Sequence, residues 1–220
     1  MKIAYCMSGH TRGLEKTPSE PNKFFIENET VDIFISTWES TGAGKIFWQG
    51  VVEDNNLIDE DSVISVYSPV KLEVSSSKEY EYLNKFNYQF PNSIHKVNIL
   101  NTLLMFKKIK RSFELVDGSY DILIRSRFDV TGLGMNLVEV EDGVIYGKLS
   151  PTNHMPSDVF FFGNRKTMID CIPEESFYTE EIINKCMNAE DVFKRHMESK
   201  GIEFRVVPDL FYVLKNEVRY

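Results

Sequence analysis

Two arginines and an aspartate alternate in the segment Arg125-Ser126-Arg127-Phe128-Asp129, directly after the apolar run Ile122-Leu123-Ile124. If this run is a strand that continues through the segment, residues 125, 127 and 129 share one face, because side chains alternate along a strand. Arginine donates paired hydrogen bonds to phosphate oxygens, and a carboxylate holds a hard divalent cation that bridges the same phosphates. The spacing predicts a nucleoside-diphosphate site; the structural alternative is an ion-pair ladder at the strand end.

An acidic pair, Glu190-Asp191, opens a predicted helix that Asn188 caps and that reaches Lys200 before Gly201. A carboxylate at this place can act as a general base that takes a proton from an acceptor hydroxyl. The pair also suits a structural role, since Asn188 and Asp191 have the spacing of a capping box and acids favour helix N-termini. Both interpretations of Glu190 and Asp191, catalytic and structural, stay open.

Polar side chains that could contact a ligand also stand at the ends of other apolar runs. His10 and Arg12 follow the first run and would bind phosphate, or else lie on a loop surface. Trp38 ends the second run and could stack on a base or sugar, or pack in the core. Asp158 precedes the run Val159 to Phe162, where its carboxylate could accept hydrogen bonds from sugar hydroxyls.

Apolar runs bounded by polar or glycine-bearing segments predict the elements that must position these residues. We expect strands at Ile3–Met7, Val31–Ser36, Val63–Val66, the apolar part of Tyr120–Asp129, Val144–Tyr146, Val159–Phe162, Ile202–Val207 and Phe211–Leu214. A long helix is expected from about Ile94 to about Leu115, capped by Asn92-Ser93 and ended by Asp117-Gly118. Its polar positions near the C-terminus are Lys107, Lys108, Lys110 and Arg111.

Strands alternate with helices in the first half of the chain, and the second half is richer in strands. This order predicts a single α/β domain over residues 1–220, with a mainly parallel central sheet, antiparallel additions and flanking helices. In open sheets of this type ligands bind beyond the carboxyl ends of the strands. The polar loops after Met7, Ile35 and Ile124 should therefore border one site.

Composition narrows the class of protein. With 42% hydrophobic and 26% charged residues the chain is globular, and its net charge of −8 argues against non-specific nucleic-acid binding. The three cysteines, Cys6, Cys171 and Cys186, match no zinc or redox spacing and are expected to be reduced thiols in the cytoplasm. The N-terminal apolar run is too short for a signal peptide, and no later run approaches the roughly 20 residues of a transmembrane helix. We therefore expect a soluble protein.

Four segments in order resemble small glycosyltransferases with the nucleotide-diphospho-sugar transferase (GT-A) fold. They are Ile3–Arg12, Val31–Trp38, Tyr120–Asp129 and Ser157–Asn164. Such enzymes are encoded by large DNA viruses, phages and bacterial surface-polysaccharide clusters. The resemblance implies a GT-A-like (Rossmann-like) fold, a nucleoside-diphosphate sugar donor, a glycan, lipid or protein acceptor, and Mn²⁺ or Mg²⁺ as the metal. It also implies a viral or bacterial source. If the source is a virus, the protein is expected in the cytoplasm of the host.

The same resemblance assigns roles to single residues. The first loop, with Ser8, Gly9, His10 and Arg12, would touch the base, ribose or phosphates of the donor. Asp129 stands at the last acidic position of the family's Asp-any-Asp metal motif, and His154 would complete the metal shell. Arg127 replaces the first aspartate of that motif; arginine cannot ligate a cation but can neutralise phosphate charge. Inverting enzymes of this fold commonly place the base in an acidic dyad like Glu190-Asp191.

Two other functions compete with glycosyl transfer. A sugar nucleotidyltransferase would use the same fold, although such enzymes usually carry a glycine-rich basic loop after the first strand, and Ser8 to Gly13 holds only two glycines. A non-catalytic nucleotide- or glycan-binding module is supported by the missing first aspartate. A dinucleotide-dependent dehydrogenase is disfavoured, because no Gly-any-Gly-any-any-Gly motif follows the first strand.

Overall fold

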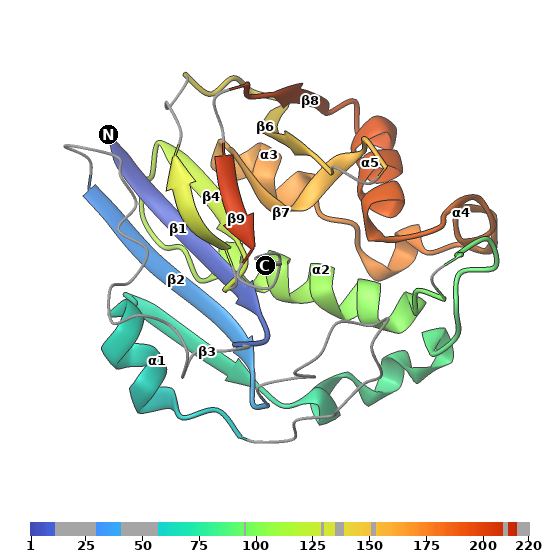
Figure 1. Ribbon diagram of the computed structural model, residues 1–220, viewed down its shortest axis with the longest axis horizontal. Coiled ribbons are helices and arrows are strands. Elements are labelled where there is room, and N and C mark those ends of the chain that lie inside the picture. The colour runs from blue at the N-terminus through green and yellow to red at the C-terminus, as the bar shows by residue number, and fades with distance from the viewer. Residues whose placement is uncertain are drawn as a thin grey trace, which may run out of the picture.

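A computed structural model describes residues 1–11, 30–40, 57–94, 96–128, 130–134, 139–150, 153–208 and 211–214. In chain order its elements are β1 (Lys2–Gly9), β2 (Thr30–Trp38), α1 (Glu60–Tyr67), β3 (Lys71–Ser75), η3 (Ser77–Phe86), α2 (Ile99–Glu114), β4 (Ile122–Ser126), β5 (Val130–Gly134), β6 (Val144–Leu149), β7 (Pro156–Gly163), α3 (Arg165–Asp170), η4 (Glu175–Phe177), α4 (Glu180–Lys185), α5 (Ala189–Ser199), β8 (Glu203–Val206) and β9 (Phe211–Leu214). Figure 1 shows their arrangement.

A seven-stranded sheet in the order β3-β2-β1-β4-β7-β6-β8 forms the centre of the fold. Its strands pair in parallel except at β7, which runs antiparallel to both β4 and β6. The predicted mixed α/β fold with a mainly parallel sheet is confirmed. β1, β4 and β7 are buried along almost their whole length, which is why they read as continuous apolar runs rather than alternating ones.

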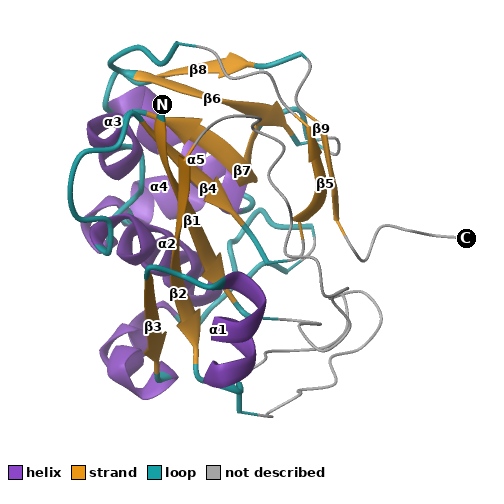
Figure 2. Ribbon diagram, turned by 90° about the vertical axis from the view of Figure 1, so that its left-hand side faces the viewer, coloured by secondary structure: helices purple, strands orange, loops and turns teal. Residues whose placement is uncertain are grey.

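Helices and a small second sheet cover the two faces of the central sheet (Figure 2). One face packs against α2, α3 and α5 through a core that includes Phe34, Phe106, Phe161 and Phe193. The other face packs against α1 and the antiparallel pair β5–β9, with Tyr5, Tyr67 and Phe128 in its core. The sheet is therefore enclosed from both sides, as a largely parallel sheet requires.

The third strand of the sheet is β3, and not the segment Val63–Val66, for which the strand prediction was wrong. Val63 lies in α1, where Val63 and Tyr67 are buried one helical turn apart. Asp59 is the N-cap of this helix; it accepts a hydrogen bond from the backbone N–H of Asp61 at 3.2 Å. The acids that follow form the first helical turn, where they suit the helix dipole.

The long helix begins later than the sequence predicted, at Ile99 rather than near Ile94. Its N-cap is Asn98, whose side-chain oxygen accepts from the backbone N–H of Asn101 at 3.2 Å. Lys96 adopts a left-handed φ of +54°, and Gln89 pairs with Asn98 in an isolated bridge, so residues before 98 cannot continue the helix. Lys108, expected at a polar position, has a side chain with 0% exposure.

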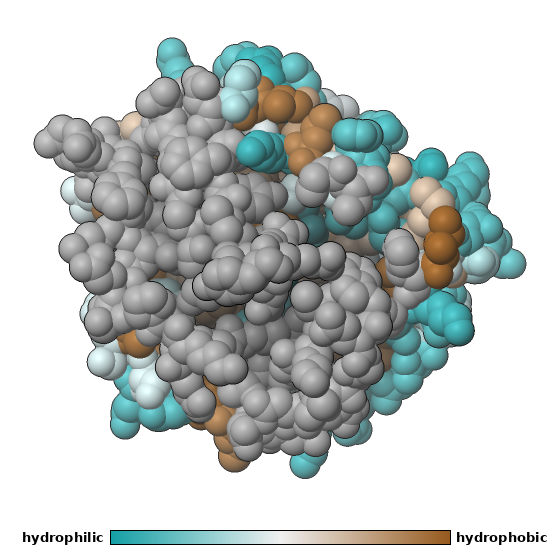
Figure 3. All heavy atoms as spheres, in the orientation of Figure 1, coloured by the Kyte–Doolittle hydropathy of each residue, from teal (hydrophilic) through white to brown (hydrophobic). Residues whose placement is uncertain are grey.

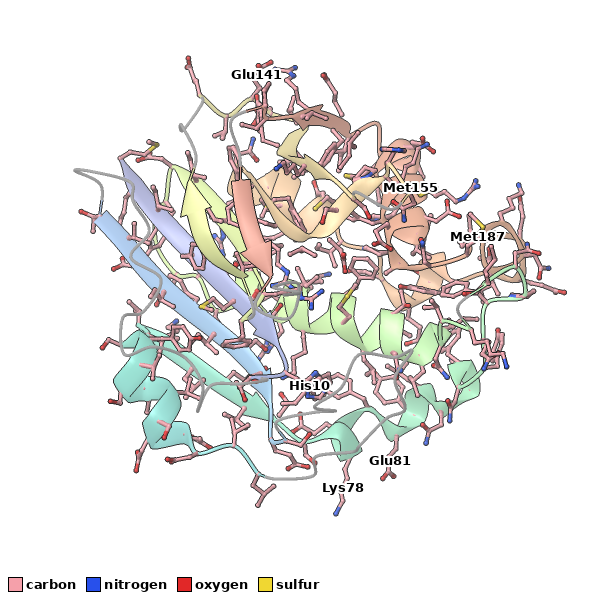
Figure 4. All side chains as sticks on the ribbon, viewed as in Figure 1. His10, Lys78, Glu81, Glu141, Met155 and Met187 are labelled. Atoms are coloured by element: carbon pink, nitrogen blue, oxygen red, sulfur yellow. The ribbon has the colours of Figure 1, made fainter. Side chains whose placement is uncertain are left out.

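Figure 3 shows one face of the molecule. In this view the described residues are mostly hydrophilic, and their apolar side chains are exposed in small, separate patches. Lys78 and Glu81 of η3 point outward from the lower border of the molecule (Figure 4). Within the described ranges no helix combines the length and apolarity needed to cross a bilayer.

Candidate active site

The strand order of the sheet reverses between β1 and β4. From β1 the chain winds outward through β2 and β3, and it then returns to the other side of β1 as β4. In open α/β sheets, ligands bind beyond the carboxyl ends of the strands at such a switch point. Because β1, β2 and β4 are parallel neighbours, the loops after Met7, Ile35 and Ile124 do meet at one edge, as predicted. This edge is the candidate site.

The end of β1 is fastened to the end of β2. Gly9 has a φ of +113°, a conformation that side chains rarely adopt, and its carbonyl accepts a hydrogen bond from Thr37 Oγ1 at 2.8 Å. The Nδ1 atom of His10 lies 3.2 Å from the carbonyl oxygen of Ser40. Ser8 is buried beneath this loop, and His10 is partly exposed at the edge. Arg12 lies outside the described residues.

Trp38 ends β2 as a packed side chain rather than an open stacking platform. It is 6% exposed, and the Nζ atom of Lys108 lies 4.6 Å from the centre of its ring. The ring of Tyr80 meets it edge-on at 5.4 Å, and the ring of His10 lies 6.1 Å away. The core-packing alternative for Trp38 is the one seen here.

The strand that was expected to continue through Arg127 is shorter than predicted, because β4 ends at Ser126. Arg125 is 1% exposed, pairs with Phe161 of β7 and donates a hydrogen bond from Nη1 to the carbonyl of Ser126. Its guanidinium is buried, and contact of Arg125 with phosphate stays a prediction. Arg127 follows the strand end and is partly exposed. Asp129 lies outside the described residues.

Three of the predicted site residues converge from separate elements: Arg127 after β4, Asp158 in β7 and Glu190 in the first turn of α5. The antiparallel pairing of β7 with β4 brings the start of β7 to the carboxyl end of β4. Burial, followed by the negative charge of Asp158, raises the pKa of Glu190 from 4.5 to about 7, while the nearby Arg127 acts in the opposite sense. Asp158 itself is 7% exposed.

Glu190 and Asp191 have different surroundings, although they are neighbours in the chain. Asp191 is 3% exposed and accepts hydrogen bonds from the backbone N–H of Met187 at 3.2 Å and from Arg195 Nε at 3.1 Å. Its own N–H donates to the side chain of Asn188 at 3.0 Å, so Asn188 is the N-cap that the sequence predicted. Asp191 is engaged in the helix start, which leaves Glu190 as the acid of the pair that faces Asp158.

The described residues do not build a site for a divalent cation. His154 is exposed in the turn between β6 and β7, with a φ of +55° and its N–H bonded to the carbonyl of Ser150 at 3.0 Å. Among the described parts of the chain, no three His, Cys, Asp or Glu side chains gather as metal ligands would. Asp158 and Glu190 supply carboxylates, but the adjacent Arg127 opposes a cation. Asp129, the other predicted metal ligand, lies outside the described residues, so binding of Mn²⁺ or Mg²⁺ stays a prediction of the family resemblance.

A charged network around the buried Lys108 was not predicted from the sequence. Glu73 of β3 accepts from Arg111 Nε at 2.5 Å, from Ser36 Oγ at 3.3 Å and from Ser75 Oγ at 3.2 Å, and it lies 3.6 Å from Lys108 Nζ. In the sequence Lys108 is one of four basic residues in a row of five, so its burial gives no local signal. Only the packing of β2, β3 and α2 separates it from its solvated neighbours.

An open groove of about 770 Å³ lies away from this edge, along the outer side of α2, η3 and Pro173–Ser176. The described residues that line it include none of the predicted site residues. Its charges are largely paired with one another, as in the ion pairs Lys85–Glu175 at 2.7 Å and Arg111–Glu114 at 3.1 Å. The groove therefore offers no concentrated charge to a ligand.

Comparison with known proteins gives little beyond this geometry. No protein-family model and no curated protein matches the chain. Among solved structures, apo mouse xyloside xylosyltransferase 1 is similar over 94% of this chain and 85% of that chain, with 8% identity and a TM-score of 0.49.

This edge of the sheet combines the carboxylate of Glu190 with the guanidinium of Arg127. A carboxylate whose pKa is about 7 exchanges protons readily near neutral pH. A guanidinium beside it neutralises phosphate or a developing anion. Acid–base chemistry on a hydroxyl next to an anionic leaving group is the reaction type that this combination suits.

Proposed function

We propose that this protein is a glycosyltransferase that moves a sugar from a nucleoside-diphosphate sugar to an acceptor hydroxyl. The observation that supports the proposal best is the convergence of Glu190, Asp158 and Arg127 beside the β1–β4 switch point. Each residue comes from a different element, and all three were singled out by their sequence context. The order of segments that resembles GT-A glycosyltransferases points to the same reaction.

In the proposed reaction, Glu190 is the general base. Its carboxylate takes the proton from the acceptor hydroxyl as the hydroxyl oxygen forms a bond to the anomeric carbon. The bond between that carbon and the diphosphate oxygen breaks, and the nucleoside diphosphate leaves with the electron pair. Arg127 stabilises the negative charge on the leaving diphosphate. Asp158 raises the proton affinity of Glu190 and accepts hydrogen bonds from hydroxyls of the donor sugar.

The loop after β1 is proposed to hold the nucleotide part of the donor. Gly9 lets the backbone turn sharply at the strand end, and His10 lies partly exposed beside it. Arg12, which follows in the chain, is proposed to contact phosphate. The acceptor class, whether glycan, lipid or protein, and a requirement for Mn²⁺ or Mg²⁺ stay predictions of the family resemblance.

The first test is a thermal-shift screen of nucleoside diphosphates and their sugars, each with and without Mn²⁺. A ligand that binds only the native state raises the melting temperature, by an amount that grows with its concentration above Kd. We expect one base to be preferred, and the metal arm shows whether a cation takes part in binding. No shift with any nucleotide would remove the proposal.

Substitution of Arg127 tests the site itself. Arg127→Ala should weaken binding of the stabilising nucleoside diphosphate by roughly 10- to 100-fold, because it removes a charge-assisted contact worth about 1.5–3 kcal/mol. Arg205→Ala is the matched control, since Arg205 pairs with Glu203 and Glu141 on the surface around β8. Calorimetric titration measures both variants; equal affinities in wild type and Arg127→Ala would refute the assignment.

The two competing functions give different products in the same assay. A nucleotidyltransferase would release pyrophosphate from a nucleoside triphosphate and a sugar phosphate. A binding module would take up the nucleotide sugar without consuming it, with any acceptor or metal. Consumption of the nucleotide sugar with release of the nucleoside diphosphate is the outcome that glycosyl transfer requires.

A further inference from the structure

Lys108 is a cation whose side chain is buried where α2 packs against β2 and β3. It lies in α2 at the edge of the helix's buried arc, and its side chain is 0% exposed. Its Nζ atom lies 3.4 Å from Ser36 Oγ and 3.6 Å from Glu73 Oε1, both longer than a good hydrogen bond. The nearest well-placed partner is the ring of Trp38, 4.6 Å from Nζ and within the range of a cation–π contact.

The neighbouring carboxylate does not depend on Lys108. Glu73 is held by Arg111, Ser36 and Ser75 through shorter contacts of 2.5, 3.3 and 3.2 Å. The other charged or titratable groups that act on Lys108 are Glu79 of η3 and Arg111 of its own helix. Removing the ammonium group would therefore leave no buried carboxylate without partners.

Trp38 connects this cation to the candidate site. Its ring lies 6.1 Å from the ring of His10, which is labelled in Figure 4 beside the end of β1. The adjacent Thr37 bonds to the carbonyl of Gly9 at 2.8 Å. A shift of the Trp38 ring would therefore be felt at Gly9 and His10, the start of the loop proposed to hold the nucleotide.

We propose that Lys108 is a positioning residue: its ammonium group fixes the ring of Trp38 and, through Trp38, holds His10 at the end of β1 in the position that binds the donor. This inference rests on the proposed function. Lys108 touches neither donor nor acceptor and acts only through Trp38. Its role depends on its charge, because a neutral amine loses the cation–π attraction.

The buried charge of Lys108 also affects the stability of the fold. Burial lowers the pKa of Lys108 from 10.5 to about 8, although Glu73 acts in the opposite sense. Because the unfolded chain holds this proton up to a higher pH than the folded one, the free energy of unfolding rises as pH increases from about 8 to 10.5.

The test compares wild type with Lys108→Met, a neutral side chain of similar length, and uses Lys110→Met as the control. Lys110 pairs with Glu174 on the outer side of the same helix. Wild type and both variants all carry Trp48→Phe in this experiment, so that Trp38 is the only tryptophan of the chain. Three quantities are measured: the melting temperature, the emission of Trp38 between pH 7 and 9.5, and the Kd of the nucleoside diphosphate that best stabilises wild type.

We expect Lys108→Met to melt at the same temperature as wild type or higher at pH 7, yet to bind the nucleoside diphosphate about tenfold more weakly. In wild type, Trp38 emission and Kd should both change with a midpoint near pH 8, and both should be flat in Lys108→Met. Lys110→Met should behave as wild type in all three measurements.

Three results would overturn the inference. Wild-type affinity in Lys108→Met refutes positioning but leaves the proposed function intact. A large fall in the melting temperature of Lys108→Met shows that Lys108 is needed for stability. The wild-type pH profile then decides about positioning without a variant: a Kd that does not change through pH 8 refutes it. Failure of wild type itself to bind any nucleoside diphosphate removes the proposed function and the inference together.

Discussion

At the scale of single residues, the site depends on the difference between two adjacent acids. Glu190 is partly buried, and this burial and the nearby carboxylate of Asp158 raise its pKa to about 7, whereas Asp191 is held by Arg195 and by the backbone of Met187. Because of this difference in environment we propose Glu190, and not Asp191, as the base. A base matched to neutral pH and a structural acid can occupy consecutive positions because a helix points them about 100° apart.

Glu190→Gln should separate catalysis from stability. Since the folded pKa of about 7 lies above the ordinary value of 4.5, Glu190 is more protonated in the folded chain, and the free energy of unfolding falls as pH rises from about 4.5 to 7. The variant lacks this loss and should be more stable than wild type at pH 8, by on the order of 1–3 kcal/mol, but not at pH 4. Denaturant unfolding at the two pH values measures the difference.

The same substitution should lower transfer by about 10²–10⁴-fold, because no carboxylate remains to take the acceptor proton. In wild type, kcat/KM should rise with pH through about 7, as Glu190 becomes deprotonated. A glutamine variant with wild-type activity would contradict the role of Glu190 as base.

At the scale of elements, several hydrogen bonds hold the start of α5, the helix that carries Glu190, in place; together they are called the clamp below. Asn188 caps the helix, Asp191 bonds back to Met187, and Arg195 spans from Asp191 to the carbonyl of Lys185 at 3.3 Å. The helix N-terminus is therefore tied to the end of α4. The capping-box spacing visible in the sequence predicted the cap, but not the return contact to Met187.

Asp191→Asn tests this clamp. The substitution removes the charge that pairs with Arg195 while keeping the size of the side chain, and it should destabilise the fold by about 1–3 kcal/mol. Glu198→Gln is the control, because the exposed pair Lys194–Glu198, at 3.8 Å, contributes little. Chemical denaturation gives both values; if Asp191→Asn were as stable as Glu198→Gln, the contacts of Asp191 would not be a clamp.

The elements also show how far the sequence could lead. Long apolar runs such as Ile122-Leu123-Ile124 and Val159 to Phe162 predicted β4 and β7, because a strand buried on both faces leaves a continuous signal. The strand predicted at Val63–Val66 was wrong, because a short apolar segment fits helix and strand periods equally well. The nearness of Arg127, Asp158 and Glu190 could be inferred only in part: the sheet edge was predicted from strand ends, but the antiparallel insertion of β7 was not.

At the scale of the whole molecule, β7 holds the two halves of the sheet together. It pairs with β4 on one side and β6 on the other, and Phe161 packs against Phe193 of α5 with ring centres 5.0 Å apart. The chain on either side of β7 contributes residues to the candidate site. Loss of packing at this strand should therefore affect the stability of the whole sheet.

Phe161→Ala should destabilise the protein by about 3–5 kcal/mol, since it opens a cavity at the contact between sheet and helix. Tyr82→Ala, at a residue that is 59% exposed, should change stability by less than about 0.5 kcal/mol. Denaturant titration followed by circular dichroism measures both. A small effect at Phe161 would mean that α5 is not held to the sheet through this ring.

The pairing of β1 with β4 also bears on the making of the protein. Ile3 pairs with Ile122, and Ala4 with Leu123. During synthesis β1 therefore cannot pair with β4 until more than a hundred further residues have been added. During that interval one edge of an apolar strand is open to pairing with another chain. Fragments that end before β4 should aggregate, and efficient production in cells should depend on chaperones that shield the nascent N-terminal segment.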